Sequence, residues 1–146
     1  MPRYRLPLVL TLCAAGVIAG CASESRPAPQ TLYGQAVTET LVGNSLYRTG
    51  GGWFSSWEYT GYHRDDGTMT GKVWWSDNEE IADGTWEIAP DGHYCRTWNN
   101  DWGDGKRGCF RVSRAGDTMV FEHMTGASGG ADRYVYHLQP GNPQDL

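Results

Sequence analysis

The chain of 146 residues is poor in cysteine, with four, and it has no long apolar run after its first twenty residues. A helix needs about 20 consecutive apolar residues to cross the hydrocarbon layer of a membrane. The apolar run from Leu6 to Gly20 has only about 15 residues, and no other segment approaches that length. The sequence therefore predicts no membrane-spanning helix in the mature protein.

Motifs of catalysis and cofactor binding are missing as well. The sequence contains no glycine loop that cradles phosphate, no dinucleotide-binding fingerprint and no activated cysteine. Four histidines occur singly, at His63, His93, His123 and His137. None of them stands beside another ligand at the spacing of a metal site. We therefore expect no enzyme, no catalytic residues, no metal and no cofactor.

The first twenty residues have the layout of a signal peptide. Arg3 and Arg5 form a short basic stretch, and the residues from Leu6 to Gly20 are apolar or small. The end of this run, Ile18-Ala19-Gly20-Cys21, resembles the lipobox that is read by the bacterial lipoprotein signal peptidase. The resemblance implies that residues 1–20 are removed and that Cys21 is lipidated with diacylglycerol and a further acyl chain, such as palmitate. A plain secretory signal is the alternative.

The predicted lipid anchor also indicates a location. Each buried methylene contributes roughly 0.8 kcal/mol, so several acyl chains hold a protein durably on a membrane. Ala22 follows the cysteine, and the absence of aspartate there resembles sorting to the outer membrane. We expect a cell-envelope lipoprotein on the periplasmic face of the outer membrane.

The mature chain is acidic. Removal of Arg3 and Arg5 lowers Lys plus Arg from 12 to 10 against 17 Asp plus Glu, which gives a net charge near −7. A chain of this charge is not drawn to phosphates, so we expect no nucleic-acid partner. The expected partners are the membrane, through the lipid anchor, and an envelope protein or a small ligand.

The cysteines predict one disulfide. Cys13 leaves with the signal peptide and Cys21 is consumed by lipid, which leaves Cys95 and Cys109 in a compartment that permits disulfides. The loop that they close has about 15 residues, for which chain entropy predicts roughly 3 kcal/mol of stabilisation.

The chain divides into four predicted parts: a signal peptide at 1–20, a lipidated flexible tether at 21–32, a single domain at 33–140 and a C-terminal tail at 141–146. The tether is polar and twice interrupted by proline. A short helix is expected over Thr31–Val42, where apolar residues recur loosely at helical spacing.

After the helix the pattern predicts an all-β fold, an antiparallel meander of about eight strands. Short aromatic and β-branched runs alternate with turn residues. The expected strands are Ser45–Arg48, Trp57–Arg64, Thr68–Trp75, Gly84–Ala89, His93–Trp98, Gly108–Arg114, Thr118–His123 and Arg133–Gln139. Hairpin turns are expected at Asp65-Asp66-Gly67, Pro90-Asp91-Gly92 and Ala115-Gly116-Asp117. Such a meander favours a small closed β-barrel, because closure removes exposed strand edges.

The predicted disulfide also suggests a strand register. The expected cross-strand pairs are Cys95 with Cys109, Tyr94 with Phe110, His93 with Arg111 and Gly92 with Val112. Tyr94, Phe110 and Val112 then share the inner face of the barrel.

Aromatic residues supply the candidate binding positions. Trp53, Phe54 and Trp57 follow three glycines and suit either a ligand-gripping loop at the barrel mouth or a plug in the barrel end. Trp102 lies in the loop between the two cysteines, where we expect it to be an exposed anchor for a partner. The acidic residues of that loop also suggest a cation site, but their spacing departs from the EF-hand pattern.

Several short motifs resemble known families. Val42-Gly43-Asn44-Ser45-Leu46, Asp66-Gly67-Thr68, Gly84-Thr85-Trp86 and Tyr94-Cys95-Arg96-Thr97-Trp98 occur in the order seen in a family of short bacterial envelope proteins, a domain of unknown function. Gly84-Thr85-Trp86 also resembles the G-x-W motif of lipocalins and other calycins, in which the tryptophan packs across the barrel floor. Ser128-Gly129 with Tyr134 resembles a loop of membrane-bound lysozyme inhibitors. These resemblances imply a small β-barrel and no chemistry.

We therefore predict a noncatalytic binding or inhibitory module. The alternative is a small-ligand carrier with an internal cavity, since aromatic residues can either fill a small barrel or line a pocket. A void of several hundred cubic ångströms would favour the carrier, and a filled interior would favour surface recognition.

Overall fold

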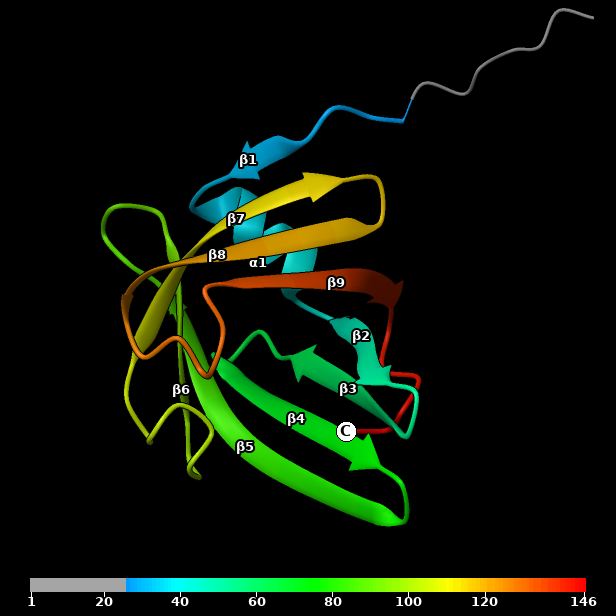
Figure 1. The fold of residues 1–146 in the computed structure, drawn as a ribbon. Helices are drawn as coiled ribbons and strands as arrows, with labels where there is room; N and C mark the ends of the chain where they lie inside the picture. The colour runs from blue at the N-terminus through cyan, green and yellow to red at the C-terminus, as the bar shows by residue number, and fades with distance from the viewer. Residues whose placement is uncertain (1–25) are drawn as a thin grey trace, which may run out of the picture.

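A computed structural model describes residues 26–146 (Figure 1). This part of the chain has one short helix, α1, and nine strands, most of them joined by tight turns. Their bounds are β1 Gln30–Leu32, α1 Gln35–Leu41, β2 Asn44–Gly52, β3 Ser55–His63, β4 Thr68–Trp75, β5 Asn78–Ile88, β6 Tyr94–Trp98, β7 Gly108–Ala115, β8 Thr118–Gly126 and β9 Arg133–Pro140.

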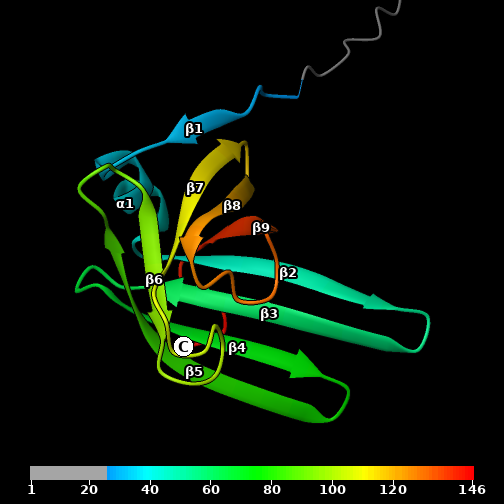
Figure 2. The ribbon, with the colours of Figure 1, turned by 60° about the vertical axis from the view of Figure 1, so that its left-hand side comes forward.

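Strands β2 to β9 form a closed antiparallel barrel, as predicted. Each strand pairs with the next in the chain, and β9 closes the barrel by pairing with β2 through Leu138 opposite Leu46. Figure 2 shows that the β2–β3 and β4–β5 hairpins extend in the same direction, beyond the rest of the barrel. The closed sheet leaves only short edges, which removes the usual sites of edge-to-edge aggregation.

The first strand lies where the sequence predicted a tether and the start of a helix. Residues Gln30–Leu32 pair with Arg114–Val112 of β7, on the edge that β6 occupies further along. Leu32 therefore lies opposite Val112, and the predicted pair of Gly92 with Val112 is wrong. The helix is shorter than predicted because the chain first turns at Gly34, whose N–H donates to the Gly92 carbonyl at 2.9 Å.

The three predicted hairpin turns are confirmed. Gly67, Gly92 and Gly116 each have positive φ, at 81°, 85° and 64°. Only glycine adopts this backbone region without steric cost, so these positions fix where one strand ends and the next begins.

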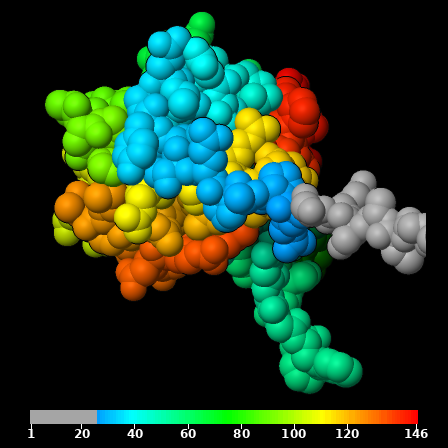
Figure 3. Space-filling model, turned by 90° about the horizontal axis from the view of Figure 1, so that it is seen from above, coloured from blue at the N-terminus to red at the C-terminus, as the bar shows by residue number. Residues whose placement is uncertain are grey.

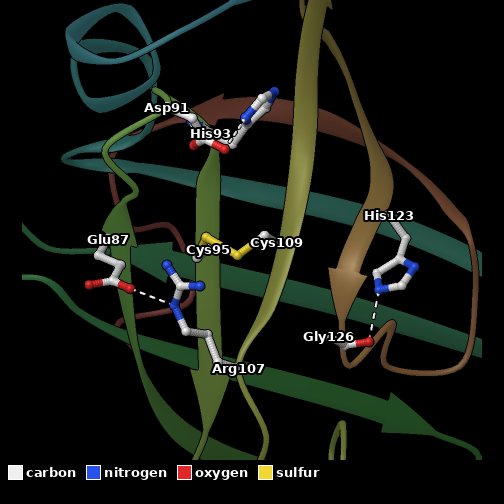
Figure 4. Close-up of a disulfide and its surroundings, with 8 residues drawn as sticks. All are labelled: Glu87, Asp91, His93, Cys95, Arg107, Cys109, His123 and Gly126. Atoms are coloured by element: carbon white, nitrogen blue, oxygen red, sulfur yellow. Dashed lines mark hydrogen bonds and ion pairs between the residues drawn. A yellow bond between two sulfur atoms is a disulfide. The ribbon is translucent and has the colours of Figure 1, made fainter.

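The disulfide is confirmed, and so are two of the four predicted cross-strand pairs. The predicted pair of His93 with Arg111 is wrong, because β6 begins at Tyr94. Cys95 of β6 is bonded to Cys109 of β7, and Tyr94 lies opposite Phe110. The bond is on the outer side of the sheet, and both cysteines are nevertheless buried. Arg107 lies close to it and pairs with Glu87 (Figure 4).

Aromatic rings fill the barrel on the side of α1. The rings of Tyr94 and Phe121 pack edge to face with their centres 5.2 Å apart, and the rings of Phe121 and Tyr136 do the same at 5.3 Å. Helix α1 adds Val37 and Leu41, which are fully buried. Side chains thus fill the barrel interior at this end, and a wide groove of about 1100 Å³ lies outside it, between β1, α1 and the β7–β8 turn.

Trp86 closes the filled end. Its indole N–H lies 3.1 Å from the carbonyl oxygens of both Arg64 and Thr68, at the β3–β4 turn, and its ring stacks on Tyr94. A buried indole that donates a hydrogen bond fixes both its own ring and the turn that it contacts. The tryptophan of the G-x-W motif thus packs across the barrel floor.

The barrel closes and buries its core within residues 26–146, so this segment contains a complete folding unit. In the same part of the chain, no helix has the length and apolar character needed to cross a membrane. The predicted signal peptide and Cys21 lie outside the described residues.

Candidate functional site

A cavity of about 560 Å³ opens at the end of the barrel opposite α1. Its walls come from strands β2, β3, β4, β6 and β9, and its rim comes from the β6–β7 and β8–β9 loops. The lining residues are Arg48, Trp57, Tyr59, Val73, Arg96, Trp98, Asp101, Trp102, Gly103, Asp104, Ala127, Ser128, Gly129, Gly130, Tyr134 and Tyr136. Ligand pockets in proteins commonly have volumes of about 300–1,000 Å³, so this cavity can hold a small molecule.

Two glycines create the space for one aromatic wall. Trp98 of β6 lies over Gly71 of β4 and Gly84 of β5, where an added Cβ would stand 2.5 Å and 3.0 Å from its ring. Trp102 then packs on Trp98 with ring centres 5.0 Å apart, and on Tyr59 at 6.3 Å. The glycine of the G-x-W motif thus sets the position of a cavity tryptophan.

Arg48 of β2 lies between rings on the opposite wall. Its guanidinium carbon is 4.6 Å from the ring centre of Trp57, 5.0 Å from Tyr134 and 5.7 Å from Tyr136. The faces of aromatic rings attract cations. These contacts hold the half-buried arginine at the cavity without a carboxylate.

Arg96 of β6 lies deeper, and only 9% of its surface is exposed. Its guanidinium donates to the Tyr136 hydroxyl at 3.4 Å and lies 4.8 Å from the ring centre of Phe110 and 5.2 Å from that of Tyr134. A guanidinium stays protonated at every ordinary pH. The floor of the cavity therefore carries a permanent positive charge.

The β8–β9 loop is held against this charge. The Tyr134 hydroxyl donates to the Ser128 carbonyl at 2.6 Å and accepts from the Ala131 N–H at 3.1 Å. A Cβ at Gly129 would stand 3.1 Å from the Tyr134 hydroxyl and 3.7 Å from the guanidinium of Arg96. The absent side chain lets the loop approach the arginine closely.

The titratable groups beneath the cavity are held neutral. Burial, with a further contribution from the charge of Arg96, lowers the pKa of His63 to about 3. Burial also raises the pKa of Tyr94 and of Tyr59 above the ordinary value for tyrosine. At neutral pH the cavity wall thus combines the neutral Tyr59 hydroxyl with the charges of Arg48 and Arg96, and the neutral His63 and Tyr94 lie behind it.

Two of the four predicted binding residues meet at the cavity. Trp57 and Trp102 both line it, although Trp102 packs inward and is half-buried rather than exposed. Trp53 and Phe54 do not reach the cavity. They form the tip of the β2–β3 hairpin, which projects from the body of the molecule (Figure 3), and are 93% and 96% exposed.

Neither arginine was among the binding residues predicted from the sequence. The signal for Arg96 was available, because it lies between Tyr94 and Trp98 with the same alternation and so faces inward. Arg48 follows the buried Leu46 by two residues and faces inward for the same reason. The hydrophobic pattern assigns inner positions to apolar residues, and a cation at such a position is easily read as solvent-exposed.

The described residues offer no cluster of three or more histidine, cysteine, aspartate or glutamate side chains that could hold a metal ion. In the loop between the cysteines, Asp104 pairs with Lys106 at 3.7 Å and the backbone N–H of Trp102 bonds to the Asn100 side chain. These contacts engage Asn100 and Asp104, two of the polar residues of that loop.

Comparison of the chain with known protein families, curated proteins and solved structures finds no match.

Proposed function

We propose that this protein is a bacterial envelope lipoprotein, anchored by acyl chains on Cys21, whose barrel binds a small ligand without catalysing its reaction. The single observation that carries the binding role is the open cavity of about 560 Å³ at one end of a barrel whose other end is filled. Concave sites with aromatic walls and a few fixed polar groups are the usual form of small-molecule sites.

The noncatalytic part of the proposal is supported by the groups around the cavity. Catalysis by a nucleophile needs an adjacent base within hydrogen-bond reach. No histidine is among the lining residues, and the nearby His63 is buried against the Tyr94 hydroxyl at 3.0 Å. The acids at the rim, Asp101 and Asp104, are exposed to solvent. The lining is suited to holding a molecule rather than to transferring protons.

The envelope location is supported by the disulfide. Disulfides persist in oxidising compartments such as the periplasm, and the bond between Cys95 and Cys109 is covered from solvent. The lipobox-like sequence that ends at Cys21 provides the second part of this argument.

The binding role can be tested with N-phenyl-1-naphthylamine, a neutral dye that fluoresces in apolar sites. Residues 26–146 should bind it saturably at one site. Combined Trp57→Ala and Trp102→Ala substitutions should weaken binding by at least about tenfold, since they remove two walls. A Val73→Phe variant, which keeps all the original aromatic rings but fills space, should also weaken it. Combined Trp53→Ala and Phe54→Ala substitutions, at the hairpin tip, are the control and should have no effect. Absence of saturable binding would reject the proposal.

A second candidate function, recognition of an envelope protein, is favoured by that hairpin tip. Two almost fully exposed aromatic residues at the end of a projecting hairpin have the composition of an interface anchor. Capture of a defined envelope protein by the chain, abolished by Trp53→Ala with Phe54→Ala and retained with Trp57→Ala, would favour this function over small-ligand binding.

A further inference from the structure

The cavity contains two positive charges that no carboxylate of the described chain neutralises. Among residues 26–146, the ion pairs within 4.0 Å involve Lys72, His93, Lys106, Arg107 and Arg111. Neither Arg48 nor Arg96 takes part in one. On the outer surface, Arg107 and Arg111 pair with acids, and Arg64 and Arg114 donate to a threonine hydroxyl and a backbone carbonyl. The two arginines at the cavity contact only aromatic rings and a tyrosine hydroxyl.

The missing partner matters most at Arg96. A buried charge is unfavourable unless it is paired or fully hydrogen-bonded, and a guanidinium has five N–H donors. In the structure Arg96 makes one side-chain hydrogen bond, to Tyr136 at 3.4 Å. The remaining donors lie beside the cavity, where a bound group can accept from them.

The acids near the cavity are placed at its rim. Asp101 and Asp104 belong to the exposed β6–β7 loop, and Asp104 is already paired with Lys106. The arginines lie on the strands, further inside. The charged side chains of the cavity are therefore acidic at its rim and basic further inside. This arrangement orients a polar ligand with its anionic group inward.

The remaining walls define the rest of the ligand. Trp57, Trp98 and Trp102 present aromatic rings, and Val73 adds an aliphatic contact. The flat rings of these tryptophans favour a ligand with a planar apolar body, because aromatic groups pack on one another either offset and face to face or edge to face.

Resting on the proposed binding function, we infer that the ligand is a small organic acid with a planar apolar body, whose anionic group is bound by Arg96 and Arg48. A charge-assisted hydrogen bond to a guanidinium gives the binding energy, and the fork of donors gives the orientation.

The matched probes for this inference are 2-naphthoate and 2-naphthamide, which share size and shape and differ in charge. Isothermal titration calorimetry on residues 26–146 should show naphthoate binding at least about tenfold more tightly than naphthamide, as expected for one charged hydrogen bond. Arg96→Met and Arg48→Met should each reduce this preference, and Arg96→Lys, which keeps the charge, should retain part of it.

Arg111→Met is the matched control, because Arg111 lies on the outer surface and pairs with Glu122 at 2.7 Å. Its preference for naphthoate should equal that of the unsubstituted chain. Equal binding of the two probes, or a preference that survives in both Arg96→Met and Arg48→Met, would overturn the inference. So would binding of the neutral dye without binding of either naphthyl probe. Failure of the dye as well would reject the binding function itself.

Discussion

His63 and Tyr94 are joined inside the barrel by a hydrogen bond of 3.0 Å between the imidazole Nε2 and the phenol oxygen. Both side chains are inaccessible to solvent, and the second ring nitrogen, Nδ1, has no partner in the described part of the chain. The imidazole also meets the Trp86 ring edge to face. A charged imidazolium at this position would lie in an apolar site near the cation of Arg96.

This placement makes stability depend on pH. The pKa of His63 falls from an ordinary 6.5 to about 3 on folding, so the unfolded chain binds the proton more readily. The contribution of His63 to the free energy of unfolding is therefore fully present above pH 6.5. It decreases as the pH falls toward 3, by up to about 1.4 kcal/mol per pH unit. Urea unfolding at pH 7 and pH 5 should show the loss.

The substitution that tests this effect is His63→Gln, which removes the titration but keeps a polar group beside Tyr94. The difference in unfolding free energy between pH 7 and pH 5 should shrink in this variant. His137→Gln, at an exposed position of β9, should keep the full difference. An unchanged pH dependence in His63→Gln would show that other groups cause it.

The strands of the barrel wall could be predicted because one face of each is buried. Strand β4 begins at Thr68 and ends at Trp75, as expected from its alternation and the turn before it. Strand β5 was predicted from Gly84 but begins at Asn78. The added part is a hairpin that extends beyond the core, so its polar residues look like a turn. It is held by pairing with β4 and by an ion pair between Lys72 and Glu79 at 2.8 Å.

The cavity could be predicted only in part. Trp57 was predicted from its position after three glycines and Trp102 from its position in the loop between the cysteines, and the structure brings both to one site. The space itself depends on which rings fill the barrel, and this follows from strand tilt and closure rather than from local pattern. A filled barrel and a hollow barrel were therefore both compatible with the sequence. The structure has a filled interior at one end and a cavity at the other.

The disulfide should contribute strongly to stability. Cys95 and Cys109 are separated by 14 positions, and a closed loop of this size is worth about 3 kcal/mol by chain entropy. Reduction should lower the melting temperature by roughly 10 °C. A chain with both Cys95→Ala and Cys109→Ala should melt at the lower temperature with or without reducing agent. Equal melting of the oxidised and reduced chains would contradict a stabilising role.

The lipid anchor can be tested on the full-length chain in a bacterial host. An alkyne analogue of palmitate supplied to the cells should label the protein, because the lipobox-like sequence places an acylated cysteine at position 21. Cys21→Ala should abolish the label. Cys13→Ala, within the predicted signal peptide, should retain it. Mass spectrometry that finds the unmodified N-terminus in the purified protein would contradict the prediction.

Gly71 should be required for the packing of the cavity wall. A Cβ at this position would stand 2.5 Å from the Trp98 ring and 2.9 Å from the Trp102 ring, so both tryptophans would have to shift. Overpacking of this kind typically costs about 1–3 kcal/mol. Gly71→Ala should therefore lower the urea midpoint and change the near-ultraviolet circular dichroism of the tryptophans. Gly52→Ala is the control, because no atom lies within 4 Å of its Cβ. If the two variants unfold at the same midpoint, Trp98 does not depend on the space above Gly71.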